Sequence, residues 1–159
     1  MFKTPGGHRR IRREDLIRFL RENSIPIHGE LSSDGTRILV VEPEKTVCAV
    51  VQRFLERAQH PFEIEVAPDA FEAGRLVCTF KPDVIFLDMH LPGVDSLDLC
   101  RRIKELADAS PVRIIATVRL GEPDLASRAT ESGASQALTK PFTPDDLRRS
   151  LAKVGVEIN

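Results

Sequence analysis

Short apolar runs alternate with longer amphipathic segments along most of the chain, from residue 37 onward. The short runs predict β-strands at residues 37–42, 62–67, 83–88, 112–117 and 135–139. Between and after them, apolar residues recur at helical spacing and predict helices over about residues 44–58, 69–79, 95–107, 122–132 and 143–154. Residues 38–41 and 84–87 are almost continuously apolar, which is typical of parallel strands covered on both faces.

Five successive strand–helix units indicate an α/β fold, with a five-stranded parallel sheet, right-handed crossovers and helices on both faces. Local signals mark several helix ends. Thr143, followed by Pro144 and two acidic residues, is typical of a helix start, because its hydroxyl caps free backbone amides and the acids suit the helix dipole. Gly133 is placed to end the preceding helix.

The first 36 residues differ in character from the rest. Residues 24–36 are rich in turn-forming types and predict a linker between a segment over 1–23 and a domain over 37–156. Within the first segment, residues 13–22 carry apolar side chains in a pattern that predicts a helix. Residues 1–28 have seven Lys and Arg against three acids, net +4, whereas the rest of the chain has 16 against 21, net −5. A basic arm joined to an acidic domain favours contact with nucleic acid.

The overall composition narrows the classes of function. A hydrophobic content of 42% and a charged content of 30% are normal for a globular domain. No apolar run approaches the ~18 residues that cross a bilayer, and no apolar leader follows the basic N-terminus. We therefore expect a cytoplasmic protein without membrane contact. The three cysteines have no CxxC spacing and predict reduced core residues, and the scattered histidines form no metal-binding pattern.

Polar residues follow the predicted strands at the carboxyl ends, where ligand sites of open α/β sheets lie. Glu42 and Asp88 end the first and third strands, Thr117 ends the fourth and Lys140 follows the fifth. Carboxylates that bind Mg²⁺, a hydroxyl and an ammonium are the groups needed for phosphoryl transfer to a carboxylate. Taken singly, each of these residue types is also common on protein surfaces. The spacing along the fourth strand also allows Ala116, instead of Thr117, to occupy the site position of that strand.

Four segments together resemble the receiver domain of two-component response regulators: residues 38–42 (ILVVE), 84–99 (VIFLDMHLPGVDSLDL), 114–117 (IIAT) and 133–142 (GASQALTKPF). The resemblance implies a flavodoxin-like fold with strand order 2-1-3-4-5. It implies that Asp88 accepts a phosphoryl group from a sensor histidine kinase or phosphotransfer protein. In this family, Thr117 would be the switch hydroxyl and Lys140 would contact the phosphoryl group.

The same resemblance implies Mg²⁺ as the cofactor. Its ligands would be Glu42, Asp88 and the backbone carbonyl of His90. The resemblance also implies a cis peptide bond before Pro141, a geometry that only X-Pro bonds adopt readily. A metal-dependent phosphohydrolase on a similar sheet is disfavoured, because His90 stands where a second acid is expected.

Three positions depart from the family's pattern. Pro43 replaces the second of two adjacent acids, which weakens the expected Mg²⁺ site unless Glu44 reaches into it. Ala137 stands where the family carries an aromatic residue that swings inward, so this readout is absent. Val118 replaces a small residue and is expected to crowd the acceptor. Pro43 and Ala137 favour an alternative function, a phosphorylation-independent pseudo-receiver that serves as a protein-interaction or dimerisation module, whereas Asp88, Thr117 and Lys140 favour the phosphoacceptor.

Residues 4–20 (TPGGHRRIRREDLIRFL) resemble the wing and following helix of excisionase and mercury-resistance-regulator type winged-helix DNA-binding domains. This resemblance implies DNA contacts from His8, Arg9 and Arg10. It begins at the wing, without the recognition helix, so we expect DNA binding only where that domain is completed. Together the two resemblances indicate a response regulator linked to transcription control, which is a signalling switch and not an enzyme. A second copy of the chain is a further expected partner.

Overall fold

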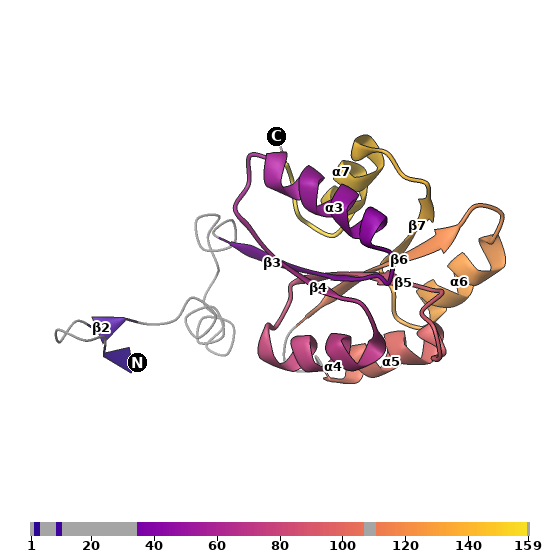
Figure 1. Cartoon of the computed structure of the whole chain (residues 1–159), viewed down its shortest axis with the longest axis horizontal. Coiled ribbons are helices and arrows are strands. Elements are labelled where there is room, and N and C mark those ends of the chain that lie inside the picture. The colour runs from indigo at the N-terminus through magenta and orange to yellow at the C-terminus, as the bar shows by residue number, and fades with distance from the viewer. Residues whose placement is uncertain (1, 4–8, 11–34, 107–110, 159) are drawn as a thin grey trace. The chain divides into compact units, whose positions relative to one another are not determined.

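The computed structural model describes residues 2–3, 9–10, 35–106 and 111–158, in two compact units over Met1–Gly35 and Thr36–Asn159 (Figure 1). In the first unit, β1 (Phe2–Lys3) and β2 (Arg9–Arg10) pair as antiparallel strands. The helix expected over 13–22, most of the expected linker and His8 lie outside the described residues. The resemblance of this segment to a DNA-binding wing therefore stays a prediction.

The second unit is built on a five-stranded parallel sheet. Its strands are β3 (Thr36–Val41), β4 (Phe62–Ala67), β5 (Val84–Asp88), β6 (Arg113–Arg119) and β7 (Gln136–Lys140). Their order across the sheet is β4-β3-β5-β6-β7, which confirms the predicted order 2-1-3-4-5. The predicted end of β6 is wrong by two residues, because Val118 and Arg119 pair with β7 and extend the strand.

Helices cover both faces of this sheet (Figure 1). One face carries α3 (Lys45–Arg57) and α7 (Pro144–Lys153), and the other carries α4 (Ala70–Thr79), α5 (Ser96–Leu106) and α6 (Pro123–Glu131). Each helix lies within one residue of its predicted range at both ends. Among the residues that the structure describes, no helix is long and apolar enough to cross a membrane.

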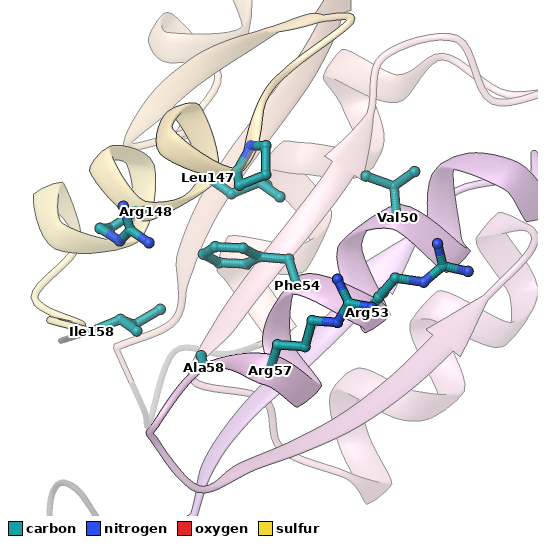
Figure 2. A pocket seen from close by; sticks show the side chains of 9 residues that line it. Val50, Arg53, Phe54, Arg57, Ala58, Leu147, Arg148 and Ile158 are labelled. Carbon is teal, nitrogen blue, oxygen red and sulfur yellow. The ribbon is translucent and has the colours of Figure 1, made fainter.

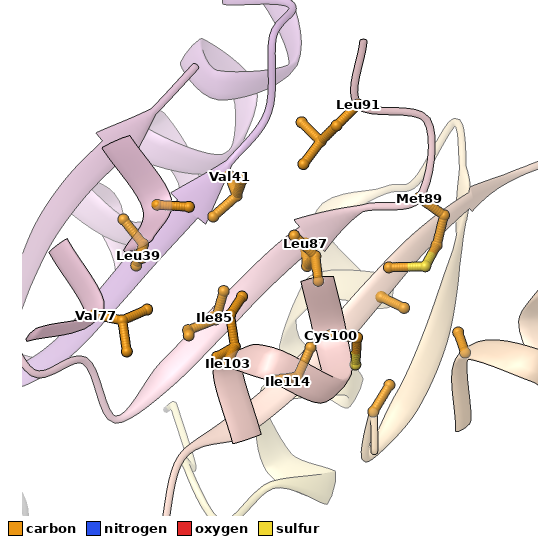
Figure 3. Close-up of a cluster of buried hydrophobic side chains, with 14 of the residues drawn as sticks. Leu39, Val41, Val77, Ile85, Leu87, Met89, Leu91, Cys100, Ile103 and Ile114 are labelled. Atoms are coloured by element: carbon orange, nitrogen blue, oxygen red, sulfur yellow. The ribbon is translucent and has the colours of Figure 1, made fainter. Parts of the chain in front are cut away.

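Side chains alternate between two cores along the buried strands. In β3, Leu39 and Val41 belong to the cluster on the side of α4, α5 and α6, which Figure 3 shows with Ile103 of α5 packed against the sheet. Ile38 and Val40 belong instead to a second cluster, on the side of α3 and α7. Burial of an aliphatic side chain of this size contributes about 1.5–3 kcal/mol. Both faces of the sheet therefore hold the unit together, as the continuous apolar strands predicted.

The predicted signals at helix ends are confirmed. Thr143 and Asp146 form a capping box at the start of α7: Thr143 Oγ1 accepts from the Asp146 amide at 3.1 Å, and an Asp146 carboxylate oxygen accepts from the Thr143 amide at 2.8 Å. The hydrogen bond from the Thr143 amide lowers the pKa of Asp146. Gly133 follows α6 with a φ of 117°, a backbone conformation that favours glycine.

Candidate functional site

Four polar residues gather at the carboxyl edge of the sheet. Glu42 follows β3, Asp88 ends β5, Thr117 lies within β6 and Lys140 ends β7. The residues two positions before them, Val40, Phe86, Ile115 and Leu138, all belong to the cluster on the side of α3 and α7. Because side chains in a strand alternate with a period of two, the four polar side chains face this same side. The register brings Asp88 and Thr117 directly opposite each other.

The alternation also separates Thr117 from its neighbours in β6. Ala116, the alternative to Thr117, is fully buried in the cluster on the other face of the sheet. Val118 belongs to that same cluster. The structure therefore places the Thr117 side chain, and not that of Ala116, on the face of Asp88. That Val118 crowds the acceptor stays a prediction, since its side chain packs in the cluster that also holds Met89, the residue after Asp88.

Lys140 joins the two carboxylates of the site. Its Nζ donates to Oε1 of Glu42 at 2.5 Å and to Oδ1 of Asp88 at 3.4 Å. The side chains of Glu42 and Asp88 are only 3% and 5% exposed, and that of Lys140 is 19% exposed. Two carboxylates buried this deeply need a counter-charge, and the Lys140 ammonium supplies it. The peptide bond between Lys140 and Pro141 is cis, as the family resemblance implied.

The remaining oxygens of Glu42 are held by the start of α3. Its Oε2 accepts from the backbone amide of Glu44 at 3.1 Å, and its backbone carbonyl accepts from Sγ of Cys48 at 3.5 Å. Burial, together with the charge of Glu42, raises the pKa of the Cys48 thiol. Glu44 is the N-cap residue of α3, and its side chain is exposed. No described contact brings the Glu44 carboxylate to Asp88, so only its backbone takes part in the site.

Asp88 keeps one carboxylate oxygen open. Oδ1 accepts from the backbone amide of His90 at 3.2 Å, in addition to the contact with Lys140. Within the described ranges, Oδ2 accepts no hydrogen bond. The Met89 amide donates to the carbonyl of Thr117 at 3.0 Å and fixes the turn after β5 against β6. An unoccupied carboxylate oxygen beside an ammonium can act as a nucleophile toward phosphorus.

The hydroxyl of Thr117 is buried without a partner. Among the described side chains, its Oγ1 is a fully buried polar atom that makes no hydrogen bond. It lines a small cavity of about 10 Å³, together with Glu42, Val47 and Phe142. A buried hydroxyl without a partner costs free energy, so such groups in native proteins need an explanation. An acceptor atom that reached this hydroxyl would remove that cost.

A contact between two loops at the site is not predicted by the sequence. His90 Nε2 lies 2.8 Å from Oε1 of Glu122, and the same oxygen accepts from the Arg119 amide at 2.7 Å. The hydrogen bond with His90 lowers the pKa of Glu122. The pair ties the turn after β5 to the turn after β6. Since the two residues are 32 positions apart and lie in different loops, no local pattern marks them.

The carboxylates of Glu42 and Asp88 are suitable ligands for Mg²⁺, but they are only two. Mg²⁺ in proteins typically takes one or two carboxylates and keeps several waters. Glu42 and Asp88 offer two such carboxylates on one face, while Pro43 between β3 and α3 offers none. In the part of the chain that the structure describes, no group of three or more His, Cys, Asp and Glu side chains could hold a metal ion. Water and the carbonyl of His90 would therefore have to complete the shell.

Comparison with known proteins agrees with this geometry. The family model of the response regulator receiver domain matches residues 38–152. The phosphate regulon transcriptional regulatory protein PhoB of Pseudomonas aeruginosa is 33% identical over 120 residues, which cover 76% of this chain and 52% of that protein. The sensor histidine kinase AruS of the same species is 36% identical over 131 residues, which cover 80% of this chain and 13% of that protein.

Solved structures show the same fold. The signal receiver domain of a DNA-binding response regulator (MerR) from Colwellia psychrerythraea 34H matches with a TM-score of 0.68 and 30% identity, covering 74% of this chain and 96% of that one. The chain spans only 13% of the length of AruS and 52% of the length of PhoB. The matched segment runs from β3 into α7 and contains all four residues of the sheet edge. The chain belongs to the response regulator receiver domain family of two-component systems.

Proposed function

We propose that this receiver domain is a phosphoacceptor switch with Asp88 as the acceptor. The observation that carries the proposal is that polar groups around Asp88 have hydrogen-bonding capacity left over. One carboxylate oxygen is free of donors, the Lys140 ammonium lies 3.4 Å from the other oxygen, and the buried hydroxyl of Thr117 has no partner among the described residues. A phosphoryl group on Asp88 would bring oxygens to both Lys140 and Thr117.

In the proposed reaction, Oδ2 of Asp88 attacks the phosphorus of a phosphohistidine on a sensor histidine kinase or phosphotransfer protein. A P–O bond forms and the P–N bond breaks, and the histidine leaves with the bonding electron pair and takes up a proton. Lys140 moves its charge from Glu42 toward the incoming oxygens. Glu42, Asp88 and the His90 carbonyl would hold Mg²⁺, which when bound neutralises charge on the phosphoryl group. The hydroxyl of Thr117 then donates to a phosphoryl oxygen and pulls on β6.

The test is incubation of the full chain with radiolabelled acetyl phosphate and Mg²⁺. We expect labelling of the wild type and none of Asp88→Asn, an isosteric change that removes the nucleophile. Asp98→Asn is the matched control, because Asp98 is a half-exposed acid on α5 that pairs with Arg102, and we expect full labelling. Labelling that survives in Asp88→Asn would show that another residue is the acceptor.

The second candidate is a pseudo-receiver that acts by contact alone, and Pro43 and Ala137 favour it. The two functions differ in their response to beryllofluoride, which mimics an aspartyl phosphate. Amide NMR shifts centred on Asp88, Thr117 and Lys140 would support the switch. An unchanged spectrum at millimolar Mg²⁺ would support the pseudo-receiver.

The wider setting of the switch is also a proposal. The relatives include a sensor histidine kinase and a transcriptional regulator, which support a kinase or phosphotransfer partner, a place in the cytoplasm and a link to transcription control. Contact of His8, Arg9 and Arg10 with DNA is part of this proposal. No activity on an external substrate is proposed.

A further inference from the structure

A groove with an apolar floor and a basic rim lies between α3 and α7, and Figure 2 shows it from close by. Its volume is about 360 Å³. Phe54 and Leu147 form the floor, and three arginines, Arg53, Arg57 and Arg148, stand around it. A cavity of this volume accommodates one aromatic side chain.

Two of the three rim arginines carry a positive charge that no described side chain neutralises. Arg148 pairs with Asp145 at 2.7 Å. Arg53 and Arg57 are exposed and have no ion-pair partner among the described residues. The groove therefore suits an aromatic side chain with carboxylates beside it.

The same unit exposes such an aromatic side chain on α4. Phe71 is 78% exposed, although large apolar side chains are usually buried. Asp69 caps α4 and accepts from the Glu72 amide at 2.9 Å, and Glu72 pairs with Arg75 at 2.7 Å. Glu65 on the neighbouring strand β4 is also exposed. Three acids and one base thus lie on α4 and the adjacent end of β4, near Phe71 in the sequence or the fold, so the net charge of this region is opposite to that of the groove.

Phe71 cannot fill the groove of its own molecule, because α4 and the pair α3 and α7 cover opposite faces of the sheet (Figure 1). We propose that Phe71 of one copy inserts into the groove between α3 and α7 of a second copy, with its acidic neighbours against Arg53 and Arg57. The two surfaces in this contact are different, so each copy in a pair leaves one groove and one Phe71 free. Such a contact extends into chains or closes into rings instead of stopping at a dimer.

This self-association needs no phosphoryl group, so it goes beyond the proposed function and can fail or succeed independently of it. The test is analytical ultracentrifugation of the full, unphosphorylated chain over a range of concentrations. We expect the average mass of the wild type to rise past that of a dimer. Phe71→Ala and Arg57→Glu should each lower the association constant by at least about tenfold, as central anchors of interfaces do.

Two control variants match these changes. Arg128→Glu makes the same charge change in the last turn of α6, and Leu120→Ala truncates a side chain that is 79% exposed. We expect both to associate like the wild type. Because Phe71 and Arg57 are exposed, their variants should stay folded, and circular dichroism melting checks this.

Mixing the two variants gives the decisive measurement. The Phe71→Ala copy keeps an intact groove, and the Arg57→Glu copy keeps an intact Phe71. At a concentration where the wild type associates, each variant alone should be mostly monomeric, whereas an equimolar mixture should form a dimer and grow no further. A wild type that stays monomeric up to millimolar concentration, variants that associate like the wild type, or a mixture without dimers would each overturn the proposal.

Discussion

The Lys140 ammonium and the Glu42 carboxylate are 98 residues apart in the chain and form an ion pair at 2.5 Å. Their strands are not neighbours, because β5 and β6 lie between β3 and β7 in the sheet. The ion pair therefore crosses the ends of β5 and β6, and its ammonium also contacts Asp88 at the end of β5. The charge of Lys140 balances those of Glu42 and Asp88, so the three groups depend on one another.

Replacing Lys140 by Met should leave two buried carboxylates without a counter-charge. Removing one partner of a buried ion pair typically costs about 3 kcal/mol or more. We expect a loss of this order in the free energy of unfolding, measured with urea, and a smaller loss in millimolar Mg²⁺. Lys153→Met, at an exposed lysine of α7, is the control and should be nearly neutral. Equal stability of Lys140→Met and the wild type would mean that water already screens the carboxylates.

Thr117→Val should stabilise the unphosphorylated protein. The change keeps the shape of the side chain and removes a buried hydroxyl that has no partner among the residues the structure describes, and its desolvation costs roughly 1 kcal/mol. The midpoint of thermal unfolding should rise, while the response to beryllofluoride should be lost. Thr139→Val, at an exposed position of β7, should change neither. A destabilised Thr117→Val variant would indicate that a buried water bonds this hydroxyl.

Pro43→Asp should restore an acid beside Glu42 and raise the affinity for Mg²⁺. One additional carboxylate ligand is expected to lower the dissociation constant on the order of tenfold. Isothermal titration calorimetry measures the change, and Pro68→Asp, at an exposed proline after β4, is the control. An unchanged affinity would show that the site cannot use a third carboxylate.

The capping box at the start of α7 predicts that the stability of the fold depends on pH. The pKa of Asp146 is lowered in the folded state, chiefly by the Thr143 amide, so its charged form stabilises the fold above the ordinary pKa of about 3.9. This contribution is lost as the pH falls through the lowered pKa. The melting temperatures of wild type and Asp146→Asn should therefore differ most near neutral pH and converge in acid. Asp124→Asn, an exposed acid in the first turn of α6, should show a smaller difference, and a gap that widens in acid would contradict the prediction.

Most of the fold could be predicted from the sequence, because the signals are local. Strands covered on both faces must be apolar throughout, as residues 38–41 and 84–87 are. Helix ends follow from side chains such as Thr143 and from the conformation of Gly133. The true end of β6 could not be predicted, since Val118 and Arg119 continue the strand only where β7 pairs with them.

The site could be predicted only in part. Residues at strand ends converge on one edge of a parallel sheet, and this placed Glu42, Asp88 and Lys140 together. The partner that Lys140 contacts most closely depends on side-chain rotamers, which no spacing encodes. The link between His90 and Glu122 depends on how two loops approach each other, and the sequence carries no signal for it.

The shared face of the four site residues limits how this domain can vary in length. An insertion of one residue in β6 before Ala116 would put Ala116 at the position that Thr117 now occupies. A deletion there would put Val118 at that position. Either change would remove the hydroxyl while conserving almost every residue. Turns can gain or lose residues without this effect, so we expect the natural variants of this domain to differ in length between their strands and helices, with β6 constant.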